Sequence, residues 1–124
     1  MFRTLRAHWP EFTIEAVGLA LFMMSAGLCA TLLESPDSSV HRELGQPAVR
    51  RLIMGLAMGL TAVGLIYSPW GKQSGAHLNP AVTLTFVRLG KVAPWDGLFY
   101  ILAQFAGGWV GVTFVCAILG CNFL

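Results

Sequence analysis

Three stretches of the chain are too long and too apolar to belong to a water-soluble fold. Ala16–Leu33, Leu52–Gly71 and Gly97–Leu124 contain no charged residue over 18, 20 and 28 positions. A helix needs about 20 residues, within a range of about 17–25, to cross the hydrocarbon core of a bilayer. The sequence therefore predicts an integral, multi-pass membrane protein with three transmembrane helices. The expected spans are residues 12–33, 49–68 and 95–120.

The composition supports a lipid bilayer as the environment. Hydrophobic residues make up 56% of the 124 positions and charged residues 11%, whereas soluble domains contain about 25% charged residues. The net charge of +2 is too small to indicate a polyanion partner, so we expect no nucleic-acid binding. No nucleophile–base pair, nucleotide motif or metal-ligand spacing is present, so we expect no enzyme, no metal and no cofactor. Cys29, Cys116 and Cys121 are expected to be packing residues.

The basic residues predict the orientation of the chain. Five of them belong to the N-terminal tail and the second connection, namely Arg3, Arg6, Lys72, Arg88 and Lys91. Three belong to the first connection, namely Arg42, Arg50 and Arg51. Because cytoplasmic loops are enriched in Lys and Arg, this modest excess predicts a cytoplasmic N-terminus, in the plasma (inner) membrane.

The second connection contains a short apolar helix. Asn79 is a favoured N-cap, Pro80 suits the first helical position, and Gly90 suits the position after the helix end. Residues 80–89 would then form a helix about 15 Å long, half of a hydrocarbon core of about 30 Å. This helix is too apolar for a cytoplasmic loop and too short to span. An interfacial helix is the alternative, but Arg88 alone gives no basic face.

A half-length helix in a membrane limits what its lead-in can contact. Irregular backbone is tolerated at membrane depth only where it is buried in protein or lines a water-filled path. Residues 74–78 must therefore descend to mid-membrane beside protein or water. The N-terminus of the short helix would then place about half a positive charge at the membrane centre. Such an end repels cations and offers hydrogen-bond donors to a small polar solute.

Ser74–Thr83 reads SGAHLNPAVT. It is similar to the first half-helix signature of the aquaporin and aquaglyceroporin family, the major intrinsic proteins. Other segments also resemble the family: Glu15–Gly18, Met58–Leu60, Ile66–Tyr67, Tyr100–Gln104, Gly107 and Gly111. The resemblance covers the N-terminal half of the family pattern, one of its two inverted repeats. It implies an all-α membrane fold over residues 1–124, with three transmembrane helices and a re-entrant loop and half-helix at 74–89.

The resemblance also implies roles for individual residues. The pore motif would be Asn79, Pro80 and Ala81, with the Asn79 amide as the donor at the constriction. The backbone carbonyls along the pore would be those of Gly75, Ala76 and His77. Val82 would lie on the pore wall and Met58 at the filter. Glu15 and Gln104 would hold the loop, although Glu15 could instead extend to the interface and Gln104 could only join helices. A metal-binding or basic role for His77 is not expected.

The implied function is half of a passive channel for water or small neutral solutes such as glycerol. The alternative is a non-conducting membrane interaction or assembly subunit. The expected partner is a complementary inverted half, either a missing second repeat or another half-size chain, which favours a homo-oligomer. The apolar end, Gly120–Leu124, favours a partial copy of a longer channel. The pairs Gly55/Gly59 and Gly107/Gly111 have the spacing of close helix packing.

Overall fold

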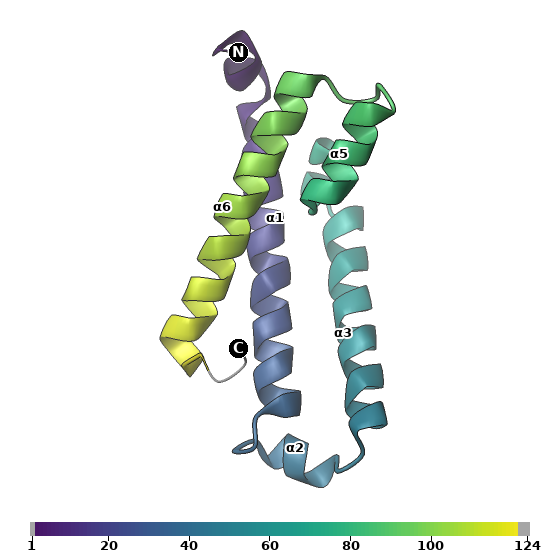
Figure 1. Cartoon of the computed structure of the whole chain (residues 1–124), viewed down its shortest axis with the longest axis vertical. Helices are drawn as coiled ribbons and strands as arrows, with labels where there is room; N and C mark the ends of the chain where they lie inside the picture. Colours follow the sequence, from purple (N-terminus) through teal and green to yellow (C-terminus); the bar gives the residue numbers. More distant parts are fainter. Residues whose placement is uncertain (1, 122–124) are drawn as a thin grey trace.

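The computed structural model describes residues 2–121, and within this range the fold is entirely helical (Figure 1). The elements are α1 (Phe2–Glu34), α2 (Ser39–Glu43), α3 (Pro47–Tyr67), α4 (Pro69–Ser74), α5 (Pro80–Arg88) and α6 (Pro94–Leu119). Asn122–Leu124, part of the apolar end considered above, lie outside the described residues.

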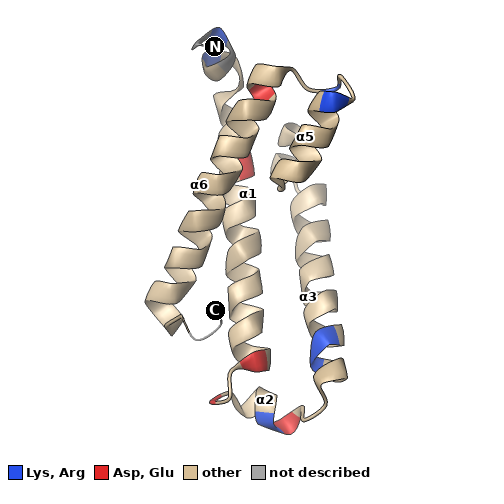
Figure 2. Ribbon diagram, viewed as in Figure 1, with Lys and Arg blue, Asp and Glu red and all other residues tan. Residues whose placement is uncertain are grey.

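Three of these helices are long and apolar enough to cross a membrane, which confirms the expected fold class. They are Leu5–Glu34 of α1, all of α3 and all of α6. Figure 2 shows that the Lys, Arg, Asp and Glu residues gather toward the two ends of the long axis. The middle of the molecule is almost free of charge, as the hydrocarbon core requires.

The first helix begins at Phe2 and not at residue 12, because a short helical piece precedes the expected span and joins it at a kink. His8 has non-helical dihedrals there, with φ −120° and ψ 19°. Pro10 follows two residues later and removes one backbone donor, which favours the start of a new helix at this point. The His8 Nδ1 atom lies 2.8 Å from Oδ1 of Asp96, in the first turn of α6.

The connection between α3 and α5 is more helical than its turn-rich composition suggests. Ser68 caps α4 by accepting a hydrogen bond from the backbone N of Gly71, and Pro69 occupies the first position. A Cβ at Gly71 would overlap the carbonyl oxygen of Leu65, so only glycine allows α4 to fold back on the end of α3. The half-helix α5 begins at Pro80, as expected from the Asn-Pro pair, and ends at Arg88.

Helices α1 and α6 are the most closely packed pair of helices in the described fold. A Cβ at Gly107 would overlap the backbone carbonyl of Ala16, and a Cβ at Gly111 would lie 2.5 Å from the carbonyl oxygen of Ala20. These glycines therefore let the two backbones touch, as small residues do in membrane helix pairs. Gly55 and Gly59 differ, since a Cβ there would meet nothing within 4 Å. The prediction that Gly55 and Gly59 pack closely against another helix is therefore wrong within this chain.

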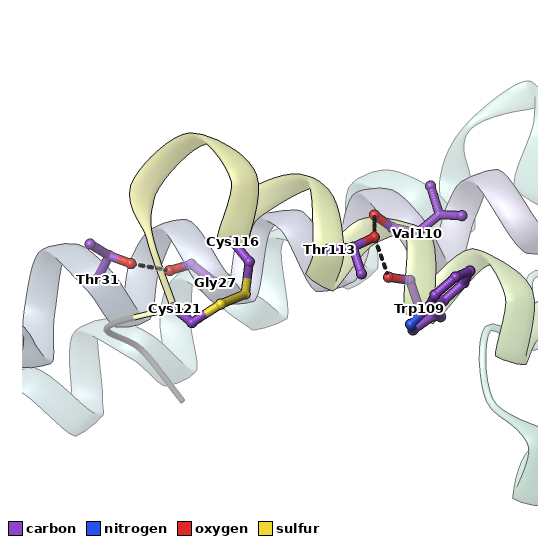
Figure 3. Close-up of a disulfide and its surroundings, with 7 residues drawn as sticks. All are labelled: Gly27, Thr31, Trp109, Val110, Thr113, Cys116 and Cys121. Carbon is purple, nitrogen blue, oxygen red and sulfur yellow. Dashed lines mark hydrogen bonds between the residues drawn. A yellow bond between two sulfur atoms is a disulfide. The ribbon is translucent and has the colours of Figure 1, made fainter.

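The end of α6 is closed by a disulfide between Cys116 and Cys121 (Figure 3). Gly120 has a positive φ of 74°, which turns the chain after Leu119 and brings Cys121 back to its partner. The two Cα atoms are 4.6 Å apart. The expectation that Cys116 and Cys121 serve only as packing residues is therefore wrong. Cys29 is a free, half-buried cysteine on α1.

We predict that Gly107→Ala destabilises the fold, because the added methyl group must push α6 away from the Ala16 carbonyl. Overpacking of this kind costs about 1–3 kcal/mol. Gly55→Ala is the matched control, since its methyl group enters open space and alanine has the higher helix propensity. Unfolding in mixed micelles followed by circular dichroism measures both. Equal midpoints for the two variants would contradict the close α1–α6 contact.

Candidate functional site

The candidate site is the lead-in to α5, which reaches about half-way along α1 and α6 (Figure 1). Three of its residues have left-handed backbone conformations: Gly75 at φ 88°, Ala76 at φ 46° and Leu78 at φ 48°. Glycine adopts such angles freely, but for alanine and leucine they are strained. Strained backbone persists only where the surrounding structure fixes it, so other residues must hold this segment in place.

The Glu15 carboxylate is hydrogen-bonded to this segment. Its side chain is fully buried, and each carboxylate oxygen accepts two hydrogen bonds. Oε1 accepts from the Ser74 hydroxyl and the His77 backbone N, both at 2.9 Å. Oε2 accepts from the Leu78 backbone N at 2.7 Å and the Gln104 Nε2 at 2.8 Å. The carboxylate thus binds two successive backbone N–H groups of the lead-in, so the snorkelling alternative does not describe its position.

A second set of contacts surrounds this carboxylate. The Tyr100 hydroxyl donates to the carbonyl oxygen of Ser74 at 2.7 Å. The hydroxyl oxygen of Thr83, itself fully buried, accepts from Gln104 Nε2 at 3.0 Å and lies 3.0 Å from Nδ1 of His77. These bonds join the lead-in, α5, α6 and α1 in one polar cluster. Hydrogen bonds of this kind are electrostatically stronger in a low-dielectric interior than in water.

His77 packs between aromatic rings of α5 and α6. Its ring stacks on Phe86 at 4.8 Å between centroids and lies 5.1 Å from the ring of Tyr100. The described residues contain no group of three His, Cys, Asp or Glu side chains able to hold a metal ion. The side chain of His77 therefore has a packing and hydrogen-bonding environment, while its carbonyl belongs to the lead-in.

Asn79 caps α5 with its side-chain oxygen, which leaves its side-chain NH₂ group without a partner among the described residues. Its Oδ1 accepts from the backbone N of Ala81 at 2.8 Å, next to Pro80 at the first helical position. Because the cap uses the oxygen, the Nδ2 donors point away from the helix end, and no residue among 2–121 accepts from them. The same holds for three acceptors, since no described residue donates to the carbonyl oxygens of Gly75, Ala76 and His77.

Asn79 faces an open groove of about 500 Å³ beside α1 and α6. Phe22 and Met23 of α1 line one side, and Phe105 and Gln104 of α6 line the other. The buried Oε1 atom of Gln104 has no hydrogen-bond partner among the described residues. The groove thus combines a largely apolar lining with a few polar groups, as is usual for small-molecule sites.

Two residues expected at the pore, Val82 and Met58, lie outside the groove. Val82 is 38% exposed on α5, and Met58 is half-buried on α3. Neither belongs to the groove lining. Their roles as pore wall and filter stay predictions, because such roles depend on a surface opposite them.

Thr83, Ser74 and Tyr100 belong to the polar cluster, although the sequence reasoning assigned them no role. A signal was present for two of them. Thr83 is one of three polar residues in the short helix, with Thr85 and Arg88. Tyr100 precedes Gln104 by four positions, which places both on one face of α6. Ser74 carries no comparable signal, because serine is common where a helix ends and a loop begins.

Comparison with known proteins gives a consistent result. A family model described as "Major intrinsic protein" matches residues 2–122. "Aquaporin-B" of Dictyostelium discoideum is 36% identical over 85% of this chain and 33% of its own length. "Aquaporin-8" of Notomys alexis is 37% identical over 87% of this chain and 38% of its own length.

An archaeal relative is also similar. "Probable aquaporin AqpM" of Archaeoglobus fulgidus is 31% identical over 89% of this chain and 48% of its own length. For "Aquaporin" of Encephalitozoon hellem the aligned share is 29% of its length. The chain thus spans less than half the length of these relatives. No solved structure matches it with significance.

We predict that Glu15→Ala loosens the lead-in, because four donors lose their acceptor at once. The free energy of unfolding should fall by several kcal/mol, since each buried donor left unpaired costs about 1–3 kcal/mol. Hydrogen exchange of the His77 and Leu78 amides should accelerate strongly. Glu43→Ala, at an exposed carboxylate on α2, is the control and should leave both amides protected. Unchanged exchange in Glu15→Ala would show that Glu15 does not hold the loop.

Proposed function

The chain belongs to the major intrinsic protein family, and we propose that it forms half of a passive channel for water or small neutral solutes such as glycerol. The observation that carries this proposal is the state of Asn79. Its oxygen is committed to the α5 cap at 2.8 Å, while both amide protons remain available at the floor of the groove. A donor fixed in this way can bind the oxygen of a passing solute without holding it in a closed site.

The carbonyl oxygens of Gly75, Ala76 and His77 supply the complementary acceptors. A water or hydroxyl group can donate to them in turn as it moves toward Asn79, which replaces the hydrogen bonds it loses from bulk water. At Asn79 the solute oxygen turns toward the amide, so a water there cannot relay a proton through that point. The positive end of the α5 dipole adds a barrier to cations.

The proposal requires a second half. Helix α5 extends only about half-way along the spanning helices (Figure 1). The groove that Asn79 lines is open. Unpaired backbone groups facing lipid would cost several kcal/mol each. We infer that residues 1–124 form one half-repeat and that an inverted counterpart covers the groove. This counterpart is a further part of a longer protein or another copy, in which case the assembly is a homo-oligomer.

We also propose that the N-terminus is cytoplasmic and that the protein resides in the plasma (inner) membrane. The support is the excess of five basic residues over three at the end of the molecule that carries the N-terminus and the α5–α6 connection. In this orientation α2 faces the outside and α5 enters the bilayer from the cytoplasm.

We predict opposite defects for two substitutions of Asn79. Asn79→Asp keeps an N-cap but places a carboxylate at the positive helix end, so cation leakage should rise while water flux persists. Asn79→Leu removes the donor, so water flux should fall. Stopped-flow shrinkage of proteoliposomes measures flux, and a pH-sensitive dye measures leakage. Gln46→Glu, which adds charge at the cap of α3, is the control. Wild-type behaviour in both Asn79 variants would place Asn79 outside the path.

We predict that the chain conducts only when it is paired. Purified protein cross-linked in liposomes should show fast osmotic flux in even-numbered species with mixed orientation and none in the monomer, because one half-helix supplies half a path. Fast flux from a verified monomer would contradict the need for a counterpart. Absence of flux from paired species would favour the alternative function, a non-conducting assembly subunit.

A further inference from the structure

A second cavity lies on the outer side of α1. It has a volume of about 190 Å³, is partly open, and is lined by residues of α1, α3, α4 and the lead-in to α5. We propose that this cavity holds a segment of a lipid acyl chain, packed directly behind the re-entrant loop. The proposal concerns the membrane contact of the fold and does not depend on what the channel conducts.

The chemistry of the lining selects an apolar occupant, because all three of its hydroxyl groups are already bonded within the chain. Thr13 donates to the carbonyl of Trp9 at 2.9 Å, and Ser68 donates to the carbonyl of Leu65 at 2.7 Å. Ser74 donates to Glu15 at 2.9 Å. The remaining wall is apolar. A polar molecule would therefore lose hydrogen bonds on entering, whereas apolar cavities of about 150 Å³ accept small hydrocarbons.

The position of the cavity indicates that it faces lipid. Its α1 wall is a single helical stripe that includes Val17 and Leu21, which are 49% and 42% exposed. The groove that contains Asn79 uses another face of α1, at Phe22 and Met23. Unpaired polar groups line that groove, so it must meet protein or water. The outer cavity has no unpaired hydroxyl group, so an acyl chain can fill it without leaving a polar group unsatisfied.

The rim of the cavity marks its depth. Thr13 lies near the start of the apolar part of α1, and Trp70, at the beginning of α4, is 65% exposed at the mouth. Tryptophan prefers the interface between headgroups and acyl chains. An acyl chain would therefore enter below Trp70 and extend toward the membrane centre.

The inner wall connects the occupant to the candidate site. Leu78 and Ser74 belong to this wall, and both are hydrogen-bonded to Glu15. Leu78 has a left-handed backbone and packs against Gly18, where a Cβ would come within 2.6 Å of its Cδ2 atom. An acyl chain behind Leu78 fills the space into which this strained residue could relax. Glu15 and the lipid would thus both contact the lead-in.

Quenching by brominated lipid tests the proposal. The full chain is prepared with Trp70 as its sole tryptophan, the other three being changed to phenylalanine, and is reconstituted in phosphatidylcholine brominated on one acyl chain. A sole-Trp95 chain is the matched control, since Trp95 begins α6 and is 49% exposed. We expect stronger quenching at Trp70 than at Trp95. Val17→Phe, which fills the cavity, should lower the quenching of Trp70 to the Trp95 level.

Further variants guard against misfolding. Leu21→Phe fills the same cavity from the next turn and should act like Val17→Phe, whereas Val110→Phe, on an exposed position of α6, should change nothing. Equal quenching of Trp70 and Trp95, or Trp70 quenching unaffected by both filling variants, would overturn the proposal. So would Trp70 quenching that is weak at high protein content and rises on dilution with lipid, because a second copy would then cover the cavity.

Discussion

A buried carboxylate in the apolar middle of a membrane protein must find hydrogen-bond donors, and the structure depends on how Glu15 finds them. A charged group at this depth is costly unless it is fully bonded. Glu15 meets this condition with four donors, two of them successive backbone N–H groups of the lead-in to α5. Charge-assisted bonds of this type are roughly twice as strong as neutral ones. The need of the carboxylate for donors therefore fixes the path of the loop.

Fixing the loop in this way divides its polar groups into two sets. The N–H groups of His77 and Leu78 turn inward to Glu15, while the carbonyls of Gly75 to His77 are left without partners among the described residues. The left-handed angles at Ala76 and Leu78 are the strain that this arrangement requires. Asn79 then opens α5 with its oxygen committed and its amide free. The unpartnered carbonyls and the Asn79 amide thus follow one another along the loop.

Sequence reasoning predicted the parts of this fold that local rules determine. Apolar length alone gave the three spanning helices, and the Asn79–Pro80 pair gave the start of α5, because caps act within a single turn. The helix α4 was missed, although Ser68 and Pro69 carry a cap signal, because glycine and polar residues within it resemble a turn. The Cys116–Cys121 disulfide was missed since it depends on the backbone turn at Gly120.

Long-range contacts needed more than local rules. The association of Glu15 with residues 62 and 63 positions later was expected only from family resemblance, and the parts of Thr83 and Tyr100 in the polar cluster were not expected. The central claim is that Glu15 presents Asn79 to water at mid-membrane depth. Water-edited solid-state NMR of the asparagine-labelled chain in bilayers tests it most directly, with Asn79→Asp assigning the signal. Rapid transfer of water magnetisation to the Asn79 amide, lost in Glu15→Ala, is the predicted result, whereas slow transfer in the unaltered chain would contradict the account.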